Sequence, residues 1–222
     1  MSRFILSLPV LALFAGGCSD GEQSQSQAYH QSSSPVKPTV SIVPVIDNTD
    51  NDYSWNLSDE LSCSIYTRIA QKDRIVVNKS SQVRNKAKNI TERQNPFGTD
   101  LSWMKKIFQD DQFVAFLELV EHEEVPQQTR KKPTDPNKCS ADLNMSMRIR
   151  VLDIRGKEPV IVLQEIVHDS HFIPRPFTQG NFFQVSWDDD CFNISPVGLA
   201  HADFTKEIAS RIESYILTAS KQ

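Results

Sequence analysis

The sequence is poor in the residues that build recognisable catalytic motifs. Only seven of its 222 residues are glycine, and it contains neither a glycine-rich phosphate loop nor a G-x-S-x-G elbow. Its four cysteines form no C-x-x-C pair, so a zinc ribbon and a thioredoxin-type motif have no support. The formal net charge of −4 does not favour nucleic acid as a partner. We therefore expect a protein that is not an enzyme and has no cofactor, although a site assembled from distant residues would leave no such motif.

Two histidine groups are the nearest approach to a metal motif. His168 and His171 are three residues apart on a predicted strand, where such positions point to opposite faces. Asp188-Asp-Asp190 could add carboxylates, but the two imidazoles would not converge without a turn. His122-Glu-Glu124 lacks the helical i, i+4 spacing of a zincin motif. We therefore predict no metal site.

The chain also lacks an apolar run of the ~20 residues that a membrane-spanning helix needs. Its first residues instead place one positive charge, Arg3, before a shorter apolar run from Phe4 to Phe14. The small residues Ala15-Gly16-Gly17 and then Cys18 follow. This order is typical of an export signal and its cleavage zone. An ordinary signal peptide with a coincidental cysteine, or a buried apolar helix, are the alternative interpretations.

The segment that ends at Cys18 resembles the lipobox of bacterial lipoproteins. The resemblance implies cleavage before Cys18, which would become an S-diacylglycerol and N-palmitoyl cysteine holding the chain on the membrane. Several acyl chains bind a bilayer stably, whereas one binds marginally. Ser19, the residue after the cysteine, favours the outer membrane over the inner, with the domain in the periplasm.

Residues 19–38 are rich in serine and glutamine and offer almost nothing to bury, as is typical of a flexible tether. We therefore divide the chain into a signal peptide (1–17), a lipidated cysteine with its tether (18–38) and a globular domain (39–222). The length of this last part suits one domain with a core of its own.

The remaining cysteines are Cys63, Cys139 and Cys191, in a chain that its signal directs to an oxidising compartment. Cys139 and Cys191 both lie in irregular, polar stretches, and we predict a disulfide between them. Cys63 lies on the polar side of a predicted helix, so we interpret it as a surface or interface residue.

The first half of the domain predicts a strand, a helix and a second strand. The strand covers 39–47, with a bulge or edge contact at Pro44. The helix runs from its N-cap, Asn56, to about Lys72, with Asp59 and Glu60 in the first turn. Its apolar stripe comprises Leu57, Leu61, Ile65 and Ile69. A short strand at 74–78 should pair parallel with the first.

The second half predicts mainly strands. A polar, basic loop (79–99) and a short helix after Asp100 lead to a strand at 113–120, then to a loop (121–142). Strands at 143–151 and 160–167 should form an antiparallel hairpin, and Ser195-Pro196 should begin the last helix. The whole is a single α/β domain, with a mixed β-sheet in the order β-α-β-(α)-β-β-β-α and helices packed on the sheet.

Three short segments carry a second resemblance: Val40–Asn48, Ser58–Leu61 and Arg148–Lys157. They are similar to the corresponding pieces of envelope lipoproteins related to LpoB, CsgG and the N-terminal domain of TolB. Those are binding or assembly modules, which implies the same class for this chain, with an unknown envelope protein as partner. A lipid-tethered periplasmic hydrolase or metal-dependent enzyme, and a structural or surface lipoprotein, are the alternatives.

Two basic segments remain after this assignment: the loop from Lys79 to Arg93, and Arg130-Lys131-Lys132. They are either solvated loops or contacts for an acidic headgroup or protein.

Overall fold

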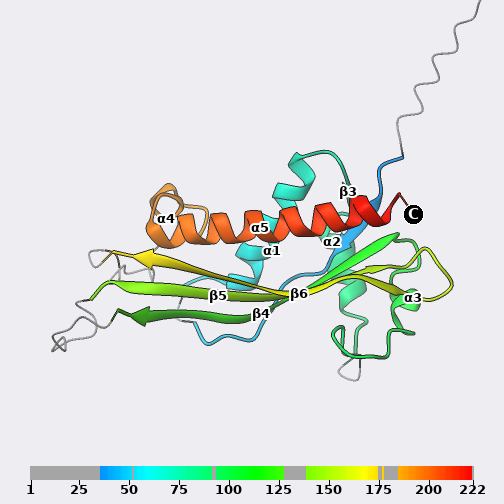
Figure 1. Ribbon diagram of the computed structural model, residues 1–222, viewed down its shortest axis with the longest axis horizontal. Coiled ribbons are helices and arrows are strands. Elements are labelled where there is room, and N and C mark those ends of the chain that lie inside the picture. The colour runs from blue at the N-terminus through cyan, green and yellow to red at the C-terminus, as the bar shows by residue number, and fades with distance from the viewer. Residues whose placement is uncertain are drawn as a thin grey trace, which may run out of the picture. The chain divides into compact units, whose positions relative to one another are not determined.

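A mixed β-sheet forms the centre of the fold (Figure 1). The computed structural model describes residues 36–51, 53–91, 94–127, 139–174, 177 and 185–221, to which all structural statements below refer. The strands are β1 (Thr39–Ile42), β2 (Ile46–Asp47), β3 (Val76–Val77), β4 (Phe113–Pro126), β5 (Ala141–Asp153) and β6 (Val160–Ile173). The helices are α1 (Leu57–Gln71), α2 (Ser80–Ala87), α3 (Met104–Ile107), α4 (Asp190–Asn193) and α5 (Pro196–Ala219).

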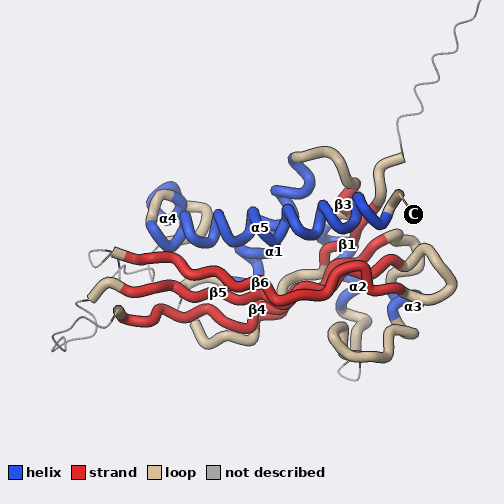
Figure 2. Tube along the Cα trace, viewed as in Figure 1, coloured by secondary structure: helices blue, strands red, loops and turns tan. Residues whose placement is uncertain are grey.

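The strand order is β3-β1-β4-β5-β6, with β2 paired to β4. The pairings of β1 with β3 and with β4 are parallel, whereas β4, β5 and β6 form an antiparallel meander. Figure 2 shows these last three as long strands side by side. The predicted fold class, including the parallel β1–β3 pair and the β5–β6 hairpin, is confirmed.

Pro44 divides the first predicted strand into β1 and β2, because proline cannot donate a hydrogen bond to a ladder. The chain stays beside β4 across this break, since Val43 N donates to Ala115 O at 2.9 Å. The predicted irregularity at Pro44 is therefore confirmed.

Both long helices begin where the sequence predicts. The side chain of Asn56 accepts a hydrogen bond from Asp59 N at 3.1 Å, and Ser195 Oγ accepts one from Gly198 N at 3.0 Å. Each cap satisfies a backbone donor that the first turn leaves unpaired. The apolar stripe of α1 is fully buried, as predicted: Leu57, Leu61, Ile65 and Ile69.

The glycine in the first turn of α5 permits a close contact with α4. A Cβ on Gly198 would lie 2.0 Å from Phe192 O, which no packed structure tolerates. Only glycine therefore lets the start of α5 approach the α4 backbone this closely.

The predicted ends of the three long strands are wrong. Residues 121–126 continue β4, and β5 already begins at Ala141, so the loop expected at 121–142 is shorter. β6 likewise extends beyond residue 167 to Ile173. Glutamate and histidine are weak strand formers, but the register with β5 supplies the missing stabilisation. A bulge at Val120 interrupts the β4 ladder between Leu119 and Glu121.

The basic segment expected as a loop at 79–99 contains a helix, α2, which Val83 anchors in the core. The two cations within α2 form ion pairs: Arg84 lies 2.7 Å from Asp59, and Lys86 lies 2.9 Å from the buried Asp111. The other basic segment, 130–132, lies outside the described residues.

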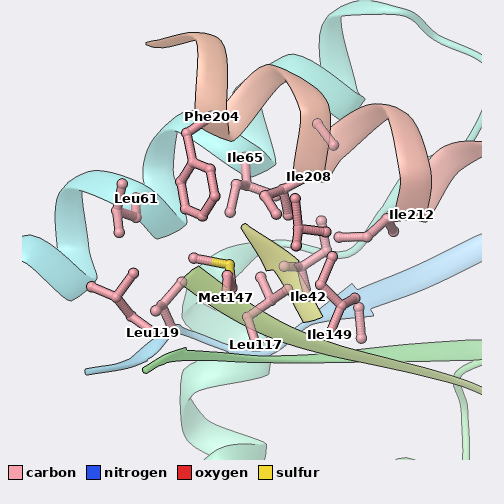
Figure 3. Close-up of a cluster of buried hydrophobic side chains, with 14 of the residues drawn as sticks. Ile42, Leu61, Ile65, Leu117, Leu119, Met147, Ile149, Phe204, Ile208 and Ile212 are labelled. Carbon is pink, nitrogen blue, oxygen red and sulfur yellow. The ribbon is translucent and has the colours of Figure 1, made fainter. Parts of the chain in front are cut away.

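The core has two parts, one on each face of the sheet. The larger part lies between the sheet and the helices α1 and α5, as Figure 3 shows for Leu61, Leu117, Ile149 and Ile208. The smaller part lies on the opposite face under α2 and α3 and their flanking turns. None of the described helices has both the length and the apolar character to cross a bilayer.

Candidate functional site

Three polar side chains form a hydrogen-bonded chain inside the larger core. Glu60 comes from the first turn of α1, His201 from α5, and His122 from β4 just after the bulge. His201 Nδ1 lies 2.7 Å from Glu60 Oε1, and His201 Nε2 lies 2.9 Å from His122 Nε2. Only 3% of Glu60 and 2% of His201 is exposed. Their mutual hydrogen bond therefore replaces the hydrogen bonds that each group would make to water in the unfolded chain. We call these three residues the buried relay.

The relay is held in place by one further donor and a shell of aromatic rings. Trp55 Nε1 donates to Glu60 Oε2 at 2.8 Å, so both oxygens of the carboxylate are hydrogen-bonded. Tyr53 stacks on Trp55 at 4.8 Å, and Phe192 meets the edge of His201 at 5.6 Å. Buried polar groups are tolerated when they are paired in this way, and removing one partner is then costly.

Burial and neighbouring charges shift the pKa values of His122, Glu124 and Tyr53. Burial first, and then the neighbouring His201, lower the pKa of His122 from 6.5 to about 3. His122 is therefore neutral at ordinary pH. Burial raises the pKa of Glu124, and burial together with the Glu124 and Glu60 charges raises the pKa of Tyr53.

One hydrogen must lie between the two imidazole rings, because neutral ring nitrogens at 2.9 Å need one donor and one acceptor. With Glu60 as a carboxylate, His201 Nδ1 is the donor to Oε1. His122 Nε2 is then the donor and His201 Nε2 the acceptor. Moving this proton onto His201 would leave an imidazolate on His122 unless a second proton reached the His122 ring from outside. The relay by itself therefore fixes the tautomers of both rings, and acid–base chemistry there would need an outside proton donor or acceptor.

The relay borders a surface hollow between α1 and α5. This hollow, of about 290 Å³, is lined by Glu60, Ser64, Arg68, Trp187, Asp188, Phe192, Asn193, Gly198, His201 and Ala202. Arg68 Nε donates to Thr205 Oγ1 at 3.2 Å, which directs the guanidinium along α5. A second hollow of about 320 Å³ shares Ser64, Arg68 and Trp187 and continues along α1 past Cys63 and Gln71. We call the two hollows together the α1 groove.

The α1 groove combines the guanidinium of Arg68, the carboxylates of Asp188 and Glu60, and the indole of Trp187. Such a set can bind a ligand that carries charged and flat apolar parts. Ser64 is a hydroxyl in the same hollow, but no hydrogen bond joins it to His201 or His122 in the described structure. The arrangement therefore shows a relay beside a groove and no serine activated as a nucleophile.

The histidines considered for a metal site lie apart, as the strand period predicts. His168 faces Ser146, with His168 Nδ1 2.8 Å from Ser146 Oγ. His171 is on the opposite face of β6, in register with the core residue Leu143, and lies 2.9 Å from Asp169. Within the ranges that the structure describes, no group of three or more histidine, cysteine, aspartate or glutamate side chains could hold a metal ion.

The cysteines have separate environments. Cys18 lies outside the described residues. Cys63 and Cys191 are exposed free thiols on α1 and α4, whereas Cys139 is buried just before β5. The predicted Cys139–Cys191 disulfide is not formed in this structure, and Cys63 is on the surface of α1, as expected.

The sequence offered only weak signals for the relay. Glu60 was predicted only as a first-turn acid, with no role in the core, but it is buried beside Leu57 and Leu61. His201 is four residues after Val197, so the apolar period of α5 already places it on the buried face. His122 was considered only as part of a metal motif.

The fold and the relay define an α/β domain with a mixed sheet and a polar chain in its core. The chain belongs to a family of unknown function, DUF7499, which matches residues 25–220. No curated protein sequence matches it.

Several solved structures are similar to this chain. The hypothetical protein CT253 from Chlamydia trachomatis has 23% identity over 81% of this chain and 98% of its own, with a TM-score of 0.64. Protein XCC0632 from Xanthomonas campestris has 8% identity, covering 85% of this chain and 93% of its own, with a TM-score of 0.49. Lipoprotein GNA1162 from Neisseria meningitidis has 11% identity, covering 78% of this chain and 99% of its own, with a TM-score of 0.43. The first similarity establishes the fold alone.

Proposed function

We propose that this chain is a lipid-anchored lipoprotein of the bacterial envelope, whose domain is a non-catalytic binding or assembly module in the periplasm. The observation that carries the proposal is the order of Arg3, the apolar run to Phe14, and Ala15-Gly16-Gly17-Cys18. The outer membrane is favoured because Ser19 follows the cysteine. The resemblance to LpoB, CsgG and TolB remains a prediction and supports the same class.

The anchor is tested by replacing the lipidated residue. Cys18→Ser should abolish incorporation of labelled palmitate and leave the precursor uncut by lipoprotein signal peptidase. Cys63→Ser is the matched control, because Cys63 is an exposed thiol in the folded domain and should leave labelling unchanged. Equal labelling of Cys18→Ser and the parent chain would refute the anchor.

The α1 groove supports the binding role, since it is an open hollow with charged groups and an indole at its rim. A photo-crosslinking amino acid at Thr67, which lines the groove, should capture a protein partner in intact cells. The control position is Lys157, an exposed residue in the β5–β6 turn. An identical set of adducts from both positions would argue against the groove as the binding surface.

The buried relay favours one alternative, a periplasmic hydrolase in which His201 or His122 moves a proton. A hydrolase needs a nucleophile or a bound water within hydrogen-bond reach of the base. Esterase and amidase activity that His201→Gln abolishes, and that Asp59→Asn leaves intact, would favour this alternative over the binding module.

A further inference from the structure

The outer edge of β6 is the longest open hydrogen-bonding edge among the described strands. β6 pairs with β5 on one side, and no described strand pairs with its other side. Natural edge strands are usually protected by lysine, by proline or by being short. β6 spans Val160–Ile173 and contains no proline, lysine or arginine. Lysine and proline, two of the features that normally prevent strand addition, are therefore missing from this edge.

β6 also exposes large apolar side chains, which favour contact with another protein over contact with water. Ile166 is 59% exposed and Phe172 is 54% exposed, both on the sheet face away from α5. Both acids of the strand already have a partner within the chain. Glu165 lies 3.0 Å from Arg211, and Asp169 lies 2.9 Å from His171. An approaching strand therefore meets no acid of β6 that lacks a partner.

The regular part of β6 is symmetric about one residue. Val162 is an extra residue in the ladder, because Val151 pairs with Leu163 whereas the next residue, Leu152, pairs with Ile161. The uninterrupted stretch is therefore Leu163–Ile173, whose midpoint is His168. An identical strand laid antiparallel about His168 would overlap this whole stretch.

Charge selects the same register. In the joint sheet, the helices of both copies would lie on the same side. The two-fold axis between the β6 strands must then pass through a residue and not between two residues, because successive side chains point to opposite faces. Centring on His168 places Glu165 of each copy opposite His171 of the other. Centring on Val167 would instead place Glu165 opposite Asp169, and like charges directly opposite are destabilising.

We propose that β6 pairs antiparallel with β6 of a second copy of this chain, about a two-fold axis at His168, to form one continuous sheet. The pairing closes the open edge of both copies and covers Ile166 and Phe172 in part. It does not depend on Cys18, so it stands or falls separately from the lipid anchor.

The register is tested by thiol crosslinking of the full chain in intact cells with a short bismaleimide. The exposed thiols are first removed by Cys63→Ser and Cys191→Ser. His168→Cys then places two thiols directly opposite each other, with Cβ atoms about 5 Å apart. Phe172→Cys is the control on the same strand. Its two copies would be eight positions apart, about 26 Å at ~3.3 Å per residue.

We expect roughly ten-fold more doubled-mass species from His168→Cys than from Phe172→Cys, because the short linker spans only the first distance. Cells that express a Gln164→Cys chain and a differently tagged Phe172→Cys chain should form the mixed dimer, because these positions are opposite each other. No dimer from His168→Cys, equal dimer from both single variants, or an adduct with a different protein would each overturn the proposal.

Discussion

His122 Nε2 lies 2.9 Å from His201 Nε2, and the two imidazoles share one hydrogen inside the core. His201 passes the contact on to Glu60, so residues from β4, α5 and α1 meet in one hydrogen-bonded chain. This hydrogen-bonded chain connects three elements of the fold. Substitutions in it, and changes of its protonation with pH, should therefore change the free energy of unfolding more than the same changes at an exposed ion pair.

Removing the charge of the relay should be costly. Glu60→Gln keeps the shape, but its amide group faces one of two donors, Trp55 Nε1 or His201 Nδ1. We expect a loss of about 2–3 kcal/mol in the free energy of unfolding, measured by urea denaturation. The adjacent acid gives the control: Asp59→Asn affects an exposed pair with Arg84 and should cost under about 1 kcal/mol. Equal losses would show that the buried position of Glu60 is unimportant.

The neutral His122 should make the fold sensitive to acid. Its pKa is about 3 when folded and 6.5 in the unfolded reference, so the unfolded state binds more protons between these values. Stability should therefore fall as the pH falls from 6.5 toward 3, by up to ~1.4 kcal/mol per pH unit.

His122→Gln should remove this contribution while Gln still offers a hydrogen bond to His201. Because burial raises the pKa of Glu124, that residue changes stability in the opposite direction, so the slope is taken as the difference between variant and parent. His168→Gln, on the other face of the sheet, is the control for loss of one histidine. The same change in slope for both variants would contradict the assignment to His122.

Gly198 should be intolerant of even the smallest side chain. Gly198→Ala would place Cβ 2.0 Å from Phe192 O, so α4 and the start of α5 would have to separate. We expect a destabilisation of about 2–4 kcal/mol, measured by thermal unfolding. Gly156→Ala is the matched control, because its Cβ would meet only Glu158 O at an ordinary 3.5 Å. A neutral Gly198→Ala would mean that the α4–α5 contact is not this close.

The thiols of the folded domain should differ in reactivity. Cys63 and Cys191 are exposed and should react with maleimide in the native protein, whereas the buried Cys139 should react only after unfolding. Non-reducing peptide mapping gives the readout. A Cys191 that reacts only after reduction, recovered in a peptide joined to Cys139, would instead support the disulfide predicted from sequence.

Local signals predicted the two long helices, α1 and α5, well, but they missed α2 and the relay. Asn56 and Ser195 are caps, and the stripe of α1 follows a simple period, so each depends on residues close in sequence. Glu60 has the same local signal as Asp59, and only the packing of α5 against α1 makes one buried and the other exposed. Propensity alone cannot separate such neighbours.

Among the strands too, local patterns predicted some parts and missed others. The alternation around Met147 predicted β5 correctly, because one face is apolar and the other polar. The extensions of β4 and β6 consist largely of glutamate, histidine and serine, which are stabilised as strand only by their cross-strand partners. Those partners are distant in sequence, so no local pattern reveals them.

The extra residue at Val120 sets the tolerance of β4 to changes in length. Strict alternation from Leu119 would direct Glu121 toward the helices, but the bulge directs His122 there instead. Deleting Val120 would restore an even ladder and leave His122 facing inward. Inserting one residue between Val120 and His122 would either leave two unmatched residues in the ladder or move His122 two positions along β5, from opposite Met145 to opposite Leu143. A shorter β4 is therefore compatible with the relay, and a longer one is not.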